Sequence, residues 1–125
     1  MRCKRVTGFS TLPNPMATKL PSAARSARAA LQASLDKLQL DDLDLYLIYQ
    51  PYGDVHGSWR AMEELHEAGR IKAIGVSNFQ PDRVMDMICH NNVKPAINQI
   101  ETHPFNQQIA TQAFLTESGG QQESW

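Results

Sequence analysis

The sequence predicts an α/β fold built on a parallel β-sheet, and its periodic pattern carries this prediction. Short apolar runs alternate with helical patterns, and five runs begin at residues 16, 43, 71, 96 and 121. Their starts are therefore 27, 28, 25 and 25 residues apart. A strand followed by a crossover helix needs about this length, and such repeats pair their strands in parallel with right-handed crossovers.

The first half of the pattern contains two predicted strands and one helix. The run at residues 16–20 is a weak strand candidate, and the helical stretch after it places Leu31 and Leu35 on one face at the 3.6-residue period. The run at residues 43–48, LDLYLI, is nearly continuous in apolar character and is followed by Pro51. That composition is typical of a strand buried on both faces of a parallel sheet.

The second half repeats the unit with clear boundary signals. One helix carries Trp59 inward and ends at Gly69, a residue suited to the left-handed conformation after a helix. Pro81 opens the next helix, where the missing N–H of proline costs nothing. A further helix ends at Gly119. The strands of this half are predicted at residues 71–76, 96–100 and 121–125.

Composition and charge exclude several classes of protein. The 125 residues carry 12 Lys and Arg against 13 Asp and Glu, and this net charge of −1 gives no global attraction for nucleic acid. No apolar run can cross a bilayer, and none follows the basic start as a signal peptide requires. Cys3 and Cys89 match no zinc spacing, and the four histidines show no ligand spacing. We expect a cytoplasmic protein with no metal and no nucleic-acid or membrane partner.

Two architectures contain the βα repeat. An open, doubly wound five-stranded sheet fits a chain of this length, whereas an eight-stranded barrel needs roughly 200 residues or more. Length alone favours the open sheet. Against it, the chain stops on Trp125 with no helix to cover a last strand, and residues 11–15, TLPNP, have the composition of a loop. We expect that both ends are cut.

Four segments resemble the aldo-keto reductase family, and most closely its bacterial diketogluconate and methylglyoxal reductase-like members. They are residues 34–48, 69–79 (GRIKAIGVSNF), 98–101 (NQIE) and 123–125 (ESW). The resemblance overturns the length argument, because it implies a (β/α)8 TIM barrel of which this chain covers about the third strand to the start of the seventh. It also implies a partial barrel domain at residues 16–125, behind an irregular, unmatched segment at residues 1–15.

The resemblance implies two catalytic positions. The family reduces carbonyls with hydride from a nicotinamide cofactor, using an Asp, a Tyr, a Lys and a His. Lys19 matches the family's lysine, and Tyr49 occupies the place where the family usually carries the His. A lysine at a strand end is otherwise a surface charge, and Tyr49 is otherwise an aromatic cap on the barrel. The family's Asp and its proton-donating Tyr precede the lysine, but here the first such residues are Asp36 and Tyr46.

The resemblance also implies half of a cofactor site. Ser77, Asn78 and Gln99 match the residues that bind the nicotinamide carboxamide, and Trp125 matches the aromatic residue that stacks on the ring. The choice of NADP over NAD is carried over from the family alone. The implied function is NADP-dependent reduction of small aldehydes and ketones, impaired or absent in this fragment, with self-association through exposed sheet edges. Two alternatives stay open: a non-catalytic βα module that binds a nucleotide or a protein, and a stable open sheet without nucleotide affinity.

Overall fold

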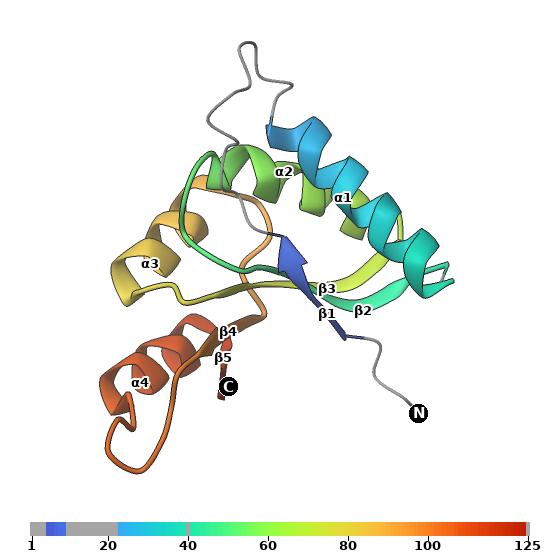
Figure 1. Cartoon of the computed structure of the whole chain (residues 1–125). Coiled ribbons are helices and arrows are strands. Elements are labelled where there is room, and N and C mark those ends of the chain that lie inside the picture. Colours follow the sequence, from blue (N-terminus) through green and yellow to red (C-terminus); the bar gives the residue numbers. More distant parts are fainter. Residues whose placement is uncertain (1–4, 10–22, 40, 125) are drawn as a thin grey trace.

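The computed structural model describes residues 5–9, 23–39 and 41–124. In these residues, five strands alternate with four helices (Figure 1). The strands are β1 (Arg5–Phe9), β2 (Leu43–Ile48), β3 (Ile71–Ser77), β4 (Ile97–Ile100) and β5 (Gln121–Ser124). The helices are α1 (Ala23–Leu38), α2 (Val55–Glu67), α3 (Pro81–His90) and α4 (Ile109–Ser118). None of the helices in this part of the chain is long and apolar enough to cross a membrane.

The strand order decides between the two architectures. All four neighbouring pairs are parallel, and the sheet order is β1-β2-β3-β4-β5, the same as the chain order. A doubly wound sheet reverses its order at a switch point, so this sheet is not of that kind. Figure 1 shows the four helices following one another around one side of the strands. This is the arrangement of a barrel segment, and the predicted partial (β/α)8 fold is confirmed.

The structure corrects the prediction for the start of the chain. Residues 1–15 were expected to be irregular, but Arg5–Phe9 is a strand that pairs in parallel with β2, with Arg5 opposite Leu45 and Thr7 opposite Leu47. The RVTGF segment contains β-branched and aromatic residues, which favour strands, and β2 offers it a backbone to pair with. Its lack of likeness to the family hid this propensity. The weak strand candidate at residues 16–20 lies outside the described residues.

The two faces of the central strands have different neighbours. Tyr46 and Ile74 belong to a cluster of buried apolar side chains that includes Trp59, whose predicted inward position is confirmed by its 0% exposure. Gly75 lies on the opposite face, where a Cβ atom would come within 2.7 Å of the main-chain oxygen of Ile97. Only glycine therefore allows β3 and β4 to approach this closely.

Helix α2 holds the loop that leads into β4. The indole Nε1 of Trp59 donates to the main-chain oxygen of Val93 at 3.0 Å, and Glu63 Oε1 accepts from the Val93 N–H at 2.7 Å. Glu63 is only 5% exposed, so both groups of one peptide-bonded residue are held inside the protein. This clamp fixes the loop between α3 and β4, and β4 carries part of the candidate site.

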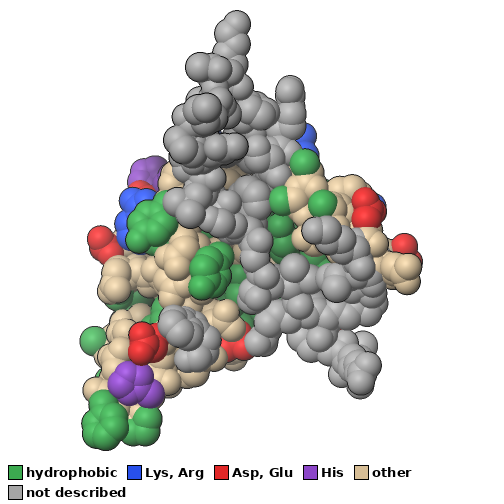
Figure 2. Space-filling view, viewed as in Figure 1, with side chains coloured by type: hydrophobic (Ala, Val, Ile, Leu, Met, Phe, Trp, Pro, Cys, Tyr) green, Lys and Arg blue, Asp and Glu red, His purple; other side chains and the backbone are tan. Residues whose placement is uncertain are grey.

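The loop between β4 and α4 presents apolar surface to solvent. Phe105 is 97% exposed and Ile109 is 67% exposed, the two largest exposures among the large apolar side chains of the described residues. Figure 2 shows apolar side chains at the lower left tip of the molecule, where this loop and α4 lie in Figure 1. This surface lies away from the buried cluster that joins the sheet to its helices.

Candidate functional site

The carboxyl ends of three neighbouring strands bring four predicted site residues together. Tyr49 follows β2, Ser77 ends β3 with Asn78 next in the chain, and Gln99 lies in β4. Ser77 and Gln99 are directly opposite each other in the register of β3 and β4. Parallel strands place their carboxyl ends at one edge of a sheet, which is where barrel enzymes build their sites. Lys19 and Trp125, the other two predicted site residues, lie outside the described residues.

Hydrogen bonds join these four residues across the three strands. The Ser77 Oγ donates to the main-chain oxygen of Gln99 at 2.8 Å, and the Asn78 N–H donates to the same oxygen at 2.9 Å. The side-chain Nδ2 of Asn78 donates to the Ser77 Oγ at 3.2 Å and to the main-chain oxygen of Tyr49 at 3.1 Å. Asn78 therefore connects the end of β2 to the ends of β3 and β4.

The backbone at Asn78 explains how this arrangement forms. Its φ is +60°, in the left-handed region that asparagine tolerates better than most residues. This conformation turns the chain out of β3, and Pro81 then begins α3 at its first position. A short, sharply turned connection keeps the Ser77 and Asn78 side chains at the strand end.

The polar groups at this edge suit a carboxamide. A carboxamide offers one C=O acceptor and an NH₂ donor, and a glutamine amide can bond both. The Gln99 side chain is half-buried and makes no hydrogen bond to any described residue. It shares a face with the Ser77 hydroxyl, which is 1% exposed, because register partners in a parallel pair point to the same side. The residues present therefore fit the nicotinamide carboxamide of a dinucleotide cofactor.

Tyr49 contributes its backbone rather than its phenol to this network. Only its main-chain oxygen contacts Asn78, and its side chain is 46% exposed with no hydrogen bond to any described residue. Tyr46, three residues earlier, is instead 1% exposed and bonded to Ser34 of α1. Burial raises the pKa of Tyr46 to about 12, so Tyr46 belongs to the core and is unsuited to donate protons near neutral pH.

The sequence analysis missed one residue that shapes this site. Asn98 is fully buried, and its Nδ2 donates to the main-chain oxygen of Phe79 at 2.7 Å. Its Oδ1 accepts from the Phe79 N–H at 3.4 Å. The signal was available, because a polar residue within the apolar strand INQI needs a partner. That argument was applied to Gln99 alone, although it holds equally for Asn98.

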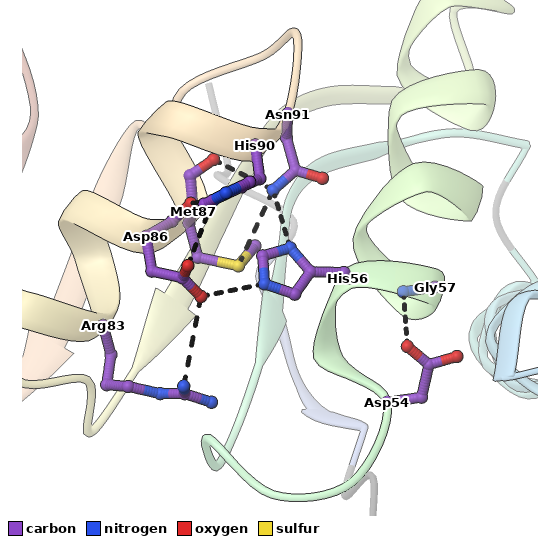
Figure 3. Close-up of polar contacts among 8 residues, drawn as sticks. All are labelled: Asp54, His56, Gly57, Arg83, Asp86, Met87, His90 and Asn91. Atoms are coloured by element: carbon purple, nitrogen blue, oxygen red, sulfur yellow. Dashed lines mark hydrogen bonds and ion pairs between the residues drawn. The ribbon is translucent and has the colours of Figure 1, made fainter.

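A second polar cluster joins α2 to α3 (Figure 3). His56 Nε2 lies 2.8 Å from Asp86 Oδ2, and His90 Nδ1 lies 3.0 Å from Asp86 Oδ1. The hydrogen bond from His56, with the nearby charges of His56, His90 and Arg83, holds the pKa of Asp86 below its usual range. Asn91 Nδ2 lies 3.2 Å from His56 Nδ1. Within the described residues, no group of three or more His, Cys, Asp or Glu side chains could hold a metal ion.

Comparison with known proteins agrees with the fold and the strand-end geometry. The family model for the aldo/keto reductase family matches residues 9–116. The chain belongs to the aldo/keto reductase family. An uncharacterized oxidoreductase of Bacillus subtilis, YtbE, is 48% identical over 98 residues, which cover 78% of this chain and 35% of that protein. Glyoxal reductase of the same organism is 44% identical over 98 residues, covering 78% and 36%.

Other aldo/keto reductases support the same assignment. The 2,5-diketo-D-gluconic acid reductase B of a Corynebacterium is 40% identical over 116 residues, covering 88% of this chain and 42% of that protein. The crystal structure of Gox0644 in its apo form superposes with a TM-score of 0.79 at 37% identity, covering 83% of this chain and 40% of that one. The Bombyx mori aldo-keto reductase in complex with NADP gives 0.77 at 32% identity, covering 83% and 37%. The chain thus spans about two-fifths of the length of these relatives.

Proposed function

We propose that this chain is part of a cytoplasmic oxidoreductase that reduces small aldehydes and ketones to alcohols with NADPH, and that its own part is to hold the nicotinamide carboxamide. The observation that carries the proposal is the meeting of Ser77, Asn78 and Gln99 at one sheet edge. Family membership supports it, as do relatives named glyoxal reductase and diketogluconic acid reductase. The choice of NADP is supported by the Bombyx mori structure, which contains NADP.

In this proposal the three residues orient the cofactor. The Gln99 amide offers a donor and an acceptor to the carboxamide, and Ser77 Oγ offers a remaining lone pair. Asn78 holds Ser77 in place through its Nδ2. Holding the carboxamide selects which ring face is presented to the substrate, which a hydride step requires. When bound, NADPH supplies the hydride.

The remaining site residues act on the substrate side of the proposal. Tyr49 donates a hydrogen bond to the substrate oxygen, Lys19 takes the place of the family's lysine, and Trp125 stacks on the nicotinamide ring. A phenol with an ordinary pKa of about 10 cannot shuttle protons near neutrality as imidazole does. No Asp precedes Asp36 and no Tyr precedes Tyr46 in these residues. We therefore propose that these 125 residues alone have impaired or no reductase activity.

The second candidate is a non-catalytic βα module that binds a nucleotide or a protein. It is favoured by Tyr49, which stands where the family usually has a histidine, and by the absence of an Asp or Tyr before Lys19. This candidate predicts saturable cofactor binding without turnover in any form of the protein that contains these residues. The reductase predicts turnover once a proton donor is supplied on the missing strands.

A cofactor titration tests both candidates. NADPH is added to the purified chain while the fluorescence of Trp59 and Trp125 is followed, with calorimetry as a second readout and NADH in a parallel titration. We expect saturable binding, a Kd about tenfold higher in Gln99→Ala, and no change in Gln112→Ala, which removes an exposed glutamine from α4. Absence of binding at millimolar NADPH would contradict the proposed function.

A further inference from the structure

The environment of Asn98 is unusual for a polar residue in a short strand. Its side chain is 0% exposed, yet both ends of its amide bond a single residue, Phe79, at 2.7 Å and 3.4 Å. Phe79 is itself 1% exposed and belongs to the buried apolar cluster. Because a buried amide must be satisfied, Asn98 and the Phe79 backbone depend on each other.

The Asn98 side chain replaces a strand that the Phe79 backbone lacks. Strand β3 ends at Ser77, and the left-handed turn at Asn78 carries the chain away from the β4 ladder. The Phe79 N–H and C=O therefore face the Asn98 amide, which presents a donor and an acceptor much as a peptide group would.

Strand β4 thereby holds the Ser77–Phe79 segment at two levels. The main-chain oxygen of Gln99 accepts from the Ser77 hydroxyl and from the Asn78 N–H, and the Asn98 side chain bonds Phe79. Asn98 and Gln99 are consecutive strand residues, so their side chains point to opposite faces. One side chain fixes the turn from the helix side, and the other faces the candidate site.

We propose that Asn98 is a positioning residue for the nicotinamide site, which it serves by fixing the Phe79 peptide and so the direction of the Ser77 and Asn78 side chains. This inference rests on the proposed function of Ser77, Asn78 and Gln99. Asn98 itself does not touch the cofactor in this arrangement, because it lies on the opposite face of β4 from Gln99. Its effect on the cofactor is therefore indirect.

A matched variant separates positioning from general stability. Glu63 is also buried, at 5% exposure, and also holds a loop by bonding main chain, but its partner is Val93 in the α3–β4 loop. Asn98→Ala and Glu63→Ala each remove one such buried side chain. Only Asn98→Ala frees the turn that carries Ser77 and Asn78.

The experiment measures NADPH affinity, urea stability and amide hydrogen exchange for the whole chain and its variants. We expect Asn98→Ala to raise the Kd for NADPH about tenfold and to speed exchange in peptides covering residues 77–82. Asn98→Asp keeps the shape and the acceptor but loses the donor of the 2.7 Å bond, so it behaves like Asn98→Ala. Glu63→Ala loses stability but keeps its Kd within about twofold, and its exchange at residues 77–82 is unchanged.

Each outcome bears on the inference. If Asn98→Ala does not fold, Asn98→Ser replaces it, since a hydroxyl can still bond one of the two Phe79 groups, and an intermediate Kd supports the role. If the wild-type chain binds NADPH and the Asn98 variants bind equally well, the role of Asn98 is wrong and the proposed function stands. If Glu63→Ala weakens binding as much as Asn98→Ala, the effect is general instability and the inference is overturned. If the wild-type chain does not bind NADPH, both fail together.

Discussion

At the scale of single residues, Asn78 is where the backbone turn and the chemistry of the site depend on one side chain. Its φ of +60° ends β3, and its Nδ2 bonds Tyr49 and Ser77. Glycine could adopt the same backbone conformation, but it would remove the amide. Alanine would remove the amide and would also be strained there.

These two substitutions give the first prediction. We expect Asn78→Ala to unfold at lower urea than Asn78→Gly, with a free energy of unfolding about 1 kcal/mol smaller, because only alanine is strained at positive φ. Both variants lose the amide, so both should bind NADPH more weakly than the wild type and about equally. Urea unfolding and NADPH titration measure the two effects. Equal stability of the two variants would show that the turn does not require a left-handed residue.

A second prediction concerns Tyr49, whose phenol is exposed while its main-chain oxygen holds Asn78. Every residue type supplies that oxygen, so Tyr49→Phe and Tyr49→His should leave the Kd for NADPH within about twofold of the wild type. Neither should create turnover of small aldehydes, since these residues contain no Asp or Tyr before Lys19 to supply the family's acid. An absorbance assay at 340 nm measures turnover. Activity gained in Tyr49→His would show that the histidine position alone limits the reaction.

The sequence indicated part of this site and missed the rest for a physical reason. Ser77, Asn78 and Gln99 could be named because motif resemblance marks residues that face a ligand, and the structure brings them together, while their role stays a prediction. Asn98 could not be named in that way, because its partner is a backbone group. A side chain that bonds main chain leaves no trace in the identity of that partner.

At the scale of secondary-structure elements, the contact between α2 and α3 depends on charge. Asp86 of α3 accepts from His56 of α2, and this contact keeps the pKa of Asp86 below its usual range. A carboxyl with a lowered pKa in the folded state stabilises the fold while it is ionised. That contribution is fully present above the ordinary carboxyl pKa of about 4, and it is lost as pH falls through the lower, folded value.

The third prediction follows from this sign. Asp86→Asn should lower the urea midpoint at pH 6, and the difference from the wild type should shrink steadily as pH falls below about 4. Glu117→Gln removes the same charge from an exposed position on α4 and serves as the control. Urea unfolding followed by circular dichroism at several pH values measures the difference. A gap between Asp86→Asn and the wild type that persists at low pH would mean that packing, and not charge, causes the effect.

The boundaries of the elements were largely predictable, because they depend on local chemistry. The strand at residues 43–48 was predicted with its observed bounds, Gly69 follows α2 at φ +75°, and Pro81 begins α3. Strand β1 was missed, because five residues with ordinary strand propensity become a strand only when a neighbour such as β2 is there to pair with them. That information is tertiary and is absent from the local pattern.

At the scale of the whole molecule, the sequential strand order has a consequence for association. β1 and β5 are the two edges of the described sheet, and β5 pairs only with β4 there. Its residues Gln121 and Ser124 are exposed. An edge of this kind offers unpaired N–H and C=O groups to another chain, and natural proteins discourage such pairing with charged side chains. Lysine is absent from β5, whose sequence is QQES.

We therefore expect the purified chain to self-associate through its sheet edges. Sedimentation equilibrium should give a mass above 14.0 kDa that rises with protein concentration. Gln121→Lys combined with Ser124→Lys places charges on the β5 edge and should return the mass toward that of the monomer. Gln112→Lys, which adds a charge to an exposed position on α4, should not.

One further variant distinguishes the edge from the other exposed surface of this molecule. Phe105→Ser removes the most exposed apolar side chain of the loop between β4 and α4 without touching β5. If the edge carries the association, Phe105→Ser leaves it unchanged, because strand pairing depends on backbone groups that this loop does not contribute. If Phe105→Ser alone restores the monomer, the apolar loop is the interface. A single species of 14.0 kDa at every concentration would show that the edges are protected in solution.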